Sequence, residues 1–265
     1  MSGMLGGLGG VWSVLLLALL PGLGNFAGGL LAEFKGASPR WRNHALHAAS
    51  GLLIAIVAVE LFPRALDGLA PWWIAAAFAA GGLAYLALEA LVERLQRGGD
   101  DRTSMWMVYV AVAVDLTADG LLIGTGSAVS TGFALVLAAG QMLADFPEGY
   151  AAIANFRERG FSRARRLLLS ASFVVFVMGA ALGSYFALRG APETWKLAAL
   201  VFVAGLLTVA AVEDMLEEAH QAREDSRGST LAFILGFTLF VLVSAGLETA
   251  LGLAEGGGGG GGGSS

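Results

Sequence analysis

The chain has 265 residues, of which 56% are hydrophobic and only 14% are charged. Soluble domains carry about 25% charged residues, so the composition predicts an integral membrane protein embedded in a lipid bilayer. The net charge of −5 and the lack of a basic stripe argue against a nucleic-acid partner. There is no cysteine, which excludes disulfides and thiolate metal sites.

The hydrophobic residues gather into segments long enough to cross a bilayer, which requires about 20 mostly apolar residues. All of these segments should be α-helices, because an open strand cannot satisfy its backbone in lipid. We therefore expect an all-α membrane protein with one eight-helix domain over 1–254 and a flexible Gly/Ser tail over 255–265. The eight predicted spans are 9–32, 45–66, 72–95, 104–128, 132–156, 165–188, 195–217 and 229–253.

The basic residues are distributed unevenly over the connections between these spans. The loops after the first, third, fifth and seventh spans hold 13 of the 16 Lys and Arg residues. Loops rich in Lys and Arg stay in the cytoplasm. This bias predicts a plasma (inner) membrane protein whose odd-numbered loops are cytoplasmic and whose two termini lie outside.

A weak internal repeat relates the first three spans to the last three. Three glycines recur 154 residues later, and a shift of five spans reverses the orientation in the membrane. The predicted architecture is therefore an inverted 3+2+3 repeat, with helices 1–3 and 6–8 around helices 4 and 5, as in many transporters. Chance remains an alternative, because the chain has 39 glycines. The recurring residues are Gly29, Gly51 and Gly82, followed by Gly183, Gly205 and Gly236.

Four carboxylates lie in the two spans outside the repeat. Asp115 and Asp119 are four residues apart, and Asp145 and Glu148 are three apart, so each pair shares one face of its helix. No Lys, Arg or His occurs between residues 102 and 157 to neutralise them. An ionisable group at membrane depth is costly and marks a functional site. The missing counter-charge is then a ligand, either a proton or a metal cation.

The surroundings of the second acidic pair favour the same interpretation. Pro147 has no backbone N–H and should expose a carbonyl oxygen near the acids. Several oxygen ligands suit a divalent cation. Because such ligands must be deprotonated, metal binding would release protons and depend on pH. A purely structural alternative is that these acids are neutral, hydrogen-bonded groups that hold the bundle together.

Two short motifs resemble those of the ZIP (zinc/iron-regulated transporter-like) family of metal transporters. Residues 115–120 (DLTADG) are similar to the family pattern His-Asn-x-x-Glu-Gly or His-Asn-x-x-Asp-Gly in its fourth helix. Residues 144–149 (ADFPEG) are similar to Gln-Asp-x-Pro-Glu-Gly in its fifth. The resemblance extends over residues 9–253. It implies eight helices, both termini outside, and movement of a divalent cation by alternating access.

The departures from the family pattern concern ligands. Asp115 stands where the family has His, Leu116 replaces Asn, Ala144 replaces His or Gln, and Phe176 stands where some members have a glutamate in helix 6. Because half of a second site is missing, the resemblance implies a mononuclear, all-oxygen site. Its metal residues would be Asp115, Asp119, Asp145 and Glu148, with Asp145 assisting or exchanging a proton.

The expected substrate is a divalent metal of the Zn, Mn, Fe or Cd class, carried as cargo, with no permanent cofactor. Loss of the imidazole should weaken the preference for Zn. The resemblance leaves proton coupling and a homodimer open. No enzyme activity is expected, since the chain has no nucleophile–base pair, P-loop or dinucleotide motif.

Two other functions stay open. One is proton-coupled transport of another solute, and the other is a membrane protein that senses metal or acts as a scaffold without transport. Glu60 and Asp214 are related by the repeat spacing near the ends of helices 2 and 7. They are expected to be hydrated at the membrane interface rather than to line a pathway.

Overall fold

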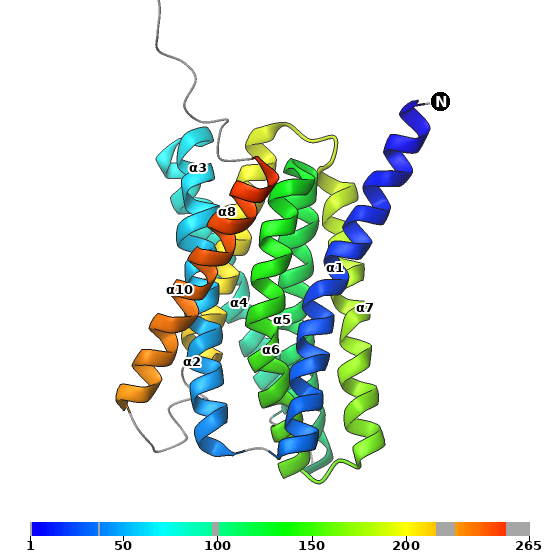
Figure 1. The fold of residues 1–265 in the computed structure, drawn as a ribbon, viewed down its shortest axis with the longest axis vertical. Coiled ribbons are helices and arrows are strands. Elements are labelled where there is room, and N and C mark those ends of the chain that lie inside the picture. The colour runs from blue at the N-terminus through cyan, green and yellow to red at the C-terminus, as the bar shows by residue number, and fades with distance from the viewer. Residues whose placement is uncertain (1, 37, 97–100, 216–225, 253–265) are drawn as a thin grey trace, which may run out of the picture.

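The computed structural model describes residues 2–36, 38–96, 101–215 and 226–252. Within these ranges the chain consists of helices joined by short turns, without a β-strand, and the long helices stand side by side (Figure 1). The elements are α1 (Ser2–Lys35), α2 (Pro39–Ala55), η1 (Ile56–Leu61), α3 (Phe62–Gly68), α4 (Pro71–Gln96), α5 (Asp101–Val129), α6 (Thr131–Glu158), α7 (Arg163–Leu188), α8 (Glu193–Ala210), η2 (Ala211–Met215) and α10 (Ser226–Leu251).

The helix ends follow local sequence signals. Gly36, with φ +79°, ends α1, and Gly160, also with φ +79°, follows α6, as expected of a residue without a Cβ. The hydroxyl of Ser130 caps α6 by accepting a hydrogen bond from the backbone N–H of Phe133 at 3.2 Å. Proline opens α2 at Pro39, where its missing N–H costs nothing. Each predicted span therefore corresponds to one helical run, with bounds shifted by a few residues.

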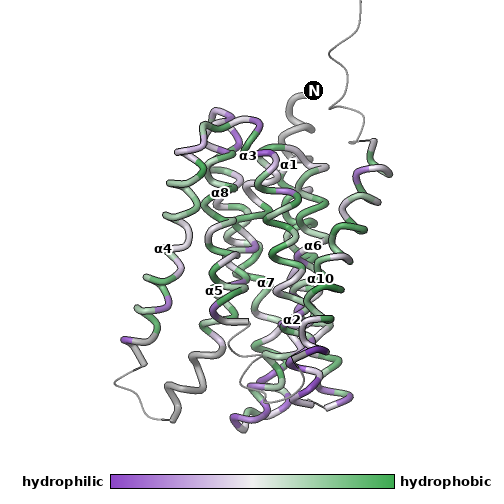
Figure 2. Tube along the Cα trace, turned by 90° about the vertical axis from the view of Figure 1, so that its left-hand side faces the viewer, coloured by the Kyte–Doolittle hydropathy of each residue, from purple (hydrophilic) through white to green (hydrophobic). Residues whose placement is uncertain are grey.

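Seven stretches among the described residues are long and apolar enough to cross a membrane. Figure 2 shows the same pattern, with hydrophobic residues along the helices and hydrophilic ones concentrated toward their ends. The prediction of an all-helical membrane protein agrees with this. The fifth predicted span, 132–156, corresponds to α6, which is 28 residues long but is not among the seven. It contacts α1, α2, α5 and α10, so protein rather than lipid covers most of it.

Two apolar clusters divide the bundle. One contains side chains of α1 and α7, and the other contains side chains of α2, α4, α8 and α10. Both α5 and α6 contribute to each cluster. These two helices therefore lie between the two halves of the core, and they are the helices that carry the four acids.

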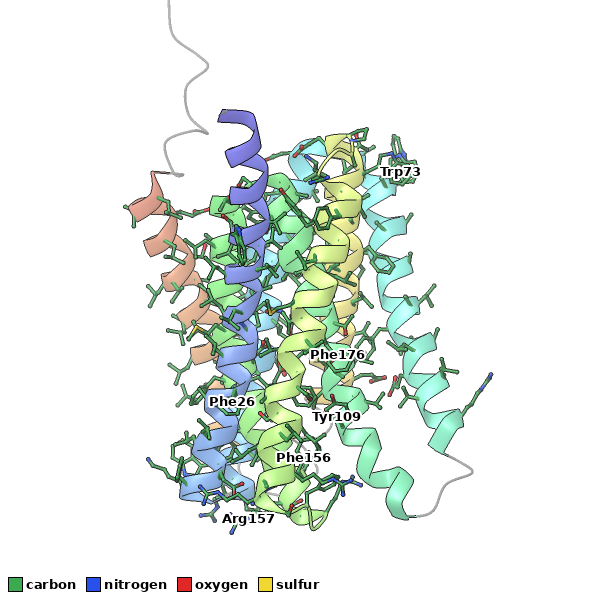
Figure 3. All side chains as sticks on the ribbon, turned by 90° about the vertical axis from the view of Figure 1, so that its right-hand side faces the viewer. Phe26, Trp73, Tyr109, Phe156, Arg157 and Phe176 are labelled. Atoms are coloured by element: carbon green, nitrogen blue, oxygen red, sulfur yellow. The ribbon has the colours of Figure 1, made fainter. Side chains whose placement is uncertain are left out.

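Glycines allow close approach where the helices cross. A Cβ at Gly149 of α6 would overlap the carbonyl oxygen of Asn25 in α1. Gly51 of α2 and Gly236 of α10 lie against each other's helix backbones in the same way, and so do Gly81 of α4 and Gly205 of α8. Small residues at such crossings let helices pack without a side chain between them. Figure 3 shows α4 and α10 at opposite outer edges of the bundle.

Two of the long helical runs contain a π-helical segment. The segment η1 interrupts the run from α2 to α3, and η2 follows α8. The hydroxyl of Ser50, in α2, donates to the carbonyl oxygen of Ala211, the first residue of η2, at 3.1 Å. Such segments are uncommon and occur frequently at functional sites.

Candidate functional site

The acidic residues of α5 and α6 face each other inside the bundle. Asp119, Asp145 and Glu148 are buried, with exposures of 3%, 0% and 8%, and Asp115 is half-buried. Asp145 and Glu148 are close enough to Asp119 on the other helix to feel its charge, and Asp119 lies within hydrogen-bonding reach of Asp145. The turn at Ser130 makes α5 and α6 antiparallel neighbours, which brings the two motifs to one level.

Neighbouring polar side chains orient two of these acids. The Nε2 of Gln141, one helical turn before Asp145 on α6, donates a hydrogen bond to Oδ1 of Asp119. The hydroxyl of Tyr85, on α4, donates to Oδ1 of Asp115 at 3.2 Å. Three helices therefore take part in the cluster. Sequence patterns indicate Gln141 only weakly and Tyr85 not at all, because neither lies in the two acidic motifs.

Asp145 is the least satisfied member of the cluster. Among the described residues, no N–H or hydroxyl group donates to either of its carboxyl oxygens, and no Lys, Arg or His forms a salt bridge with Asp119, Asp145 or Glu148. Its nearest charged neighbours are Asp119 and Glu148, which are also acidic. Burying a charge without a partner is very costly. A proton shared with Asp119, water or a bound cation would remove this cost.

The glycines of the two motifs bring further helices against the acids. A Cβ at Gly120 would overlap the carbonyl oxygen of Val177 in α7, just as one at Gly149 would overlap that of Asn25 in α1. Asn25 is fully buried, and within the described ranges neither its Oδ1 nor its Nδ2 has a hydrogen-bond partner. The sequence reasoning missed Asn25, although an isolated Asn in an apolar span is itself a signal.

The four acids are neighbours but do not form a ready coordination sphere. Among the described residues, no group of three or more His, Asp or Glu side chains is arranged to hold a metal ion. Phe176 lies away from them: it is 38% exposed and packs edge-on against Tyr109, with the ring centroids 6.1 Å apart. Coordination by several of the acids would therefore require side-chain or helix movement.

Glu60 differs from expectation. Its side chain is not hydrated at an interface but buried, with 3% exposure. The hydroxyl of Ser244, on α10, donates to it, and Nη2 of Arg64 lies 3.7 Å from its Oε2. The π-helical segment η1 turns Glu60 inward against α10, an effect that apolar periodicity does not reveal. The side chain of Asp214 lies outside the part of the chain that the structure describes.

The comparisons with known proteins add no family to this geometry. No family model and no curated protein sequence matches the chain.

Proposed function

We propose that this protein is a multi-pass membrane transporter of divalent metal cations, with Asp115, Asp119, Asp145 and Glu148 as the binding residues. The observation that carries the proposal is Asp145, a fully buried carboxylate that, within the described part of the chain, receives no hydrogen bond from an N–H or hydroxyl group and has acids as its charged neighbours. A cation supplied from outside would neutralise it. The ion is cargo here, so the site must bind it and then release it.

The chemistry of the cluster supports a metal ion of the Zn, Mn, Fe(II) or Cd class. Its donors are carboxylate oxygens, with the unpaired Oε1 of Gln141 as a further oxygen nearby. Oxygen ligands suit hard divalent cations, and the lack of imidazole lowers the relative preference for Zn. The resemblance of residues 115–120 and 144–149 to the ZIP motifs supports the same substrate class.

An inverted repeat around α5 and α6 forms part of the proposal, and three pairs of observations support it. The packing of α1 on α6 has a counterpart in that of α7 on α5. The glycine crossing of α2 with α10 has a counterpart in that of α8 with α4. The segment η2 begins at Ala211, 155 residues after η1 begins at Ile56, which is close to the 154-residue spacing of the recurring glycines.

The proposed orientation in the plasma (inner) membrane rests on charge. We place the connection from α1 to α2 and the one from α6 to α7 in the cytoplasm, because both are rich in Lys and Arg. Both termini then lie outside. Alternating access would move α1, α5, α6 and α7 against the other helices, and this movement would complete the coordination that the present arrangement lacks.

The test is uptake into liposomes that contain the purified protein and a metal-sensitive dye. Wild type should carry Mn²⁺, Zn²⁺ or Cd²⁺, and the double variant Asp119→Asn, Glu148→Gln should be inactive because two ligand charges are lost. The matched control is Asp67→Asn, Glu193→Gln, which neutralises two exposed carboxylates elsewhere. Undiminished uptake by the first double variant would contradict the assignment.

Proton-coupled transport of another solute is a second candidate, favoured by the closeness of Asp119 and Asp145. Two adjacent buried carboxyls can share a proton and release it without any metal. Calorimetry separates the two functions: absence of Mn²⁺, Zn²⁺ and Cd²⁺ binding together with a flux driven by a proton gradient would favour this one. Metal binding without flux would indicate a sensing or scaffolding protein.

A further inference from the structure

A groove of about 1070 Å³ opens on the side of the bundle. It is bordered by the end of α1, most of the length of α2, the second half of α6 and the middle of α10. One end lies where α1, α2 and α6 meet the basic connections, near Arg157 in Figure 3. The other end lies at Leu143, near the middle of α6. No part of the proposed transport mechanism uses this groove.

The outer end of the groove is cationic. Lys35, Arg157 and His44 line it together with Trp41, and Nη1 of Arg157 would lie 3.8 Å from a Cβ built on Gly36. Among the described residues, neither Lys35 nor Arg157 has a salt-bridge partner.

The one acidic residue among the described groove residues is already neutralised. Glu158 lines the groove, but Oε1 of Glu158 lies 3.0 Å from Nη1 of Arg42. The two unpaired cations therefore set the charge of the outer end, which favours an anionic ligand.

The inner end is apolar and open to the side. Phe146, Leu239 and Leu235 line it with exposures of 39%, 44% and 58%. From Arg157 to Leu143 the groove follows α6 for roughly 21 Å, at about 1.5 Å per residue. Half of a bilayer with its headgroups measures about 20–22 Å. The groove therefore has the length of one leaflet, with its charged end at the surface.

We propose that this groove binds one anionic glycerophospholipid. Lys35 and Arg157 would hold the headgroup phosphate, and an acyl chain would lie against Leu143, Phe146 and Leu239. Basic pockets between membrane helices bind anionic headgroups on the cytoplasmic side, and Trp41, 70% exposed, is placed like an interfacial aromatic anchor. A zwitterionic lipid would leave the two positive charges unbalanced.

A second copy of the chain fits the groove less well. Two copies in one membrane share one orientation, so a two-fold contact centred on this groove would bring both sets of Lys35 and Arg157 to the same level. Like charges at one level repel each other. A lipid phosphate at that level attracts them instead.

The groove also borders the acidic motif of α6. Pro147 lines it and directly precedes Glu148. A bound lipid would therefore pack against the segment of α6 that carries the acids. The lipid site does not depend on which ion, if any, the protein transports, and metal binding can be measured separately.

The test compares dioleoyl phosphatidylglycerol with dioleoyl phosphatidylcholine, added to the full-length protein in detergent and counted by native mass spectrometry. Phosphatidylglycerol should bind about thirtyfold more tightly, the effect expected of two basic side chains near an anionic headgroup. Lys35→Gln, Arg157→Gln should remove this preference. Arg159→Gln, Arg165→Gln makes the same charge change at the same end outside the groove and should preserve it.

A second variant tests the apolar part. Ala45→Trp fills the groove without changing its charge, and it should displace phosphatidylglycerol while metal binding stays at the wild-type value. Equal binding of both lipids, or wild-type preference in Lys35→Gln, Arg157→Gln, would overturn the proposal. Equal occupancy by glycerophosphoglycerol, which has no acyl chains, would also overturn it.

Occupation by a second copy can be detected because the chain has no cysteine of its own. Leu235→Cys places a single thiol at the edge of the groove. Efficient disulfide formation between copies, unaffected by added phosphatidylglycerol, would assign the groove to a dimer contact and contradict the lipid site. Cross-linking that is absent, or that phosphatidylglycerol suppresses, agrees with it.

Discussion

The side-chain amide of Gln141 donates a hydrogen bond to the carboxylate of Asp119 across the interface between α6 and α5. This contact joins the helices that carry the two acidic motifs, and it fixes Asp119 while leaving Oε1 of Gln141 without a partner. Gln141→Leu keeps the bulk of the side chain but removes the donor. Metal affinity should fall about tenfold or more, as for other groups that orient a ligand.

Isothermal titration with Mn²⁺ and Cd²⁺ checks this prediction. Met142→Leu is the matched control, because Met142 adjoins Gln141 but is 39% exposed on the outer surface. It should bind metal like wild type. Unchanged affinity in Gln141→Leu would show that Asp119 does not need this donor.

Metal binding should weaken at lower pH. Protons and metal ions compete for the same carboxylates, so each ion that enters releases any proton bound there. Titrations at about pH 6 and pH 8, in buffers of different ionisation enthalpy, measure the protons released. Asp119→Asn, Glu148→Gln should release fewer. Affinity that does not change between the two pH values would mean that the binding residues are already fully ionised.

Gly149→Ala should destabilise the protein by about 1–3 kcal/mol or more, as expected of an overpacked contact. A Cβ at this position would overlap the backbone of Asn25 and force α6 away from α1. The control is Gly183→Ala in α7, where no atom lies within 4 Å of an added Cβ. This change should be neutral or slightly stabilising, because Ala favours helix over Gly. Thermal unfolding in detergent distinguishes the two, and similar Tm values would contradict the close packing.

Arg64→Gln should lower stability by about 1–2 kcal/mol, less than for a fully buried ion pair. Arg64 lies 3.7 Å from buried Glu60 and 3.8 Å from Glu248 on α10, and its guanidinium carbon lies 3.9 Å from the ring centre of Phe133. Removing it leaves Glu60 with Ser244 as its remaining partner.

Lys196→Gln is the control for Arg64→Gln in the same unfolding assay. Lys196 is also basic, but its partner Glu193 is 63% exposed, so the loss should be below about 0.5 kcal/mol. Equal Tm changes in both variants would mean that Arg64 does not compensate the charge of Glu60.

The helical segments could be predicted because a backbone in lipid must satisfy its own N–H and C=O groups, which a helix does within one segment. The runs around 9–32 and 165–188 correspond to α1 and α7, and Gly36 marks the end of α1. The span 132–156 was also predicted to be helical, although the central polar residues of α6 keep it below the hydropathy of the other seven. The length of a segment and the spacing of its apolar residues were therefore more informative than its mean hydropathy alone.

The acidic pairs could likewise be placed on one face each, since helical spacing is local. The side chains that hydrogen-bond to these acids could not be predicted, because Tyr85 comes from another helix and Gln141 lies outside the two motifs. Glu60 was misplaced for a related reason: a π-helical turn changes the facing of a side chain without changing the hydrophobic pattern.

The sequence by itself determined that this protein is helical and rich in segments long and apolar enough to cross a membrane, and that four acids lie within two of its helices. Those features depend on composition and short-range period. Only the tertiary structure decided that Asp145 is buried without a donor, that the acids are not yet arranged around an ion, and that a groove with a cationic end runs along α6. These depend on how separate helices cross, and the crossing points are set by backbone contacts at glycines such as Gly149.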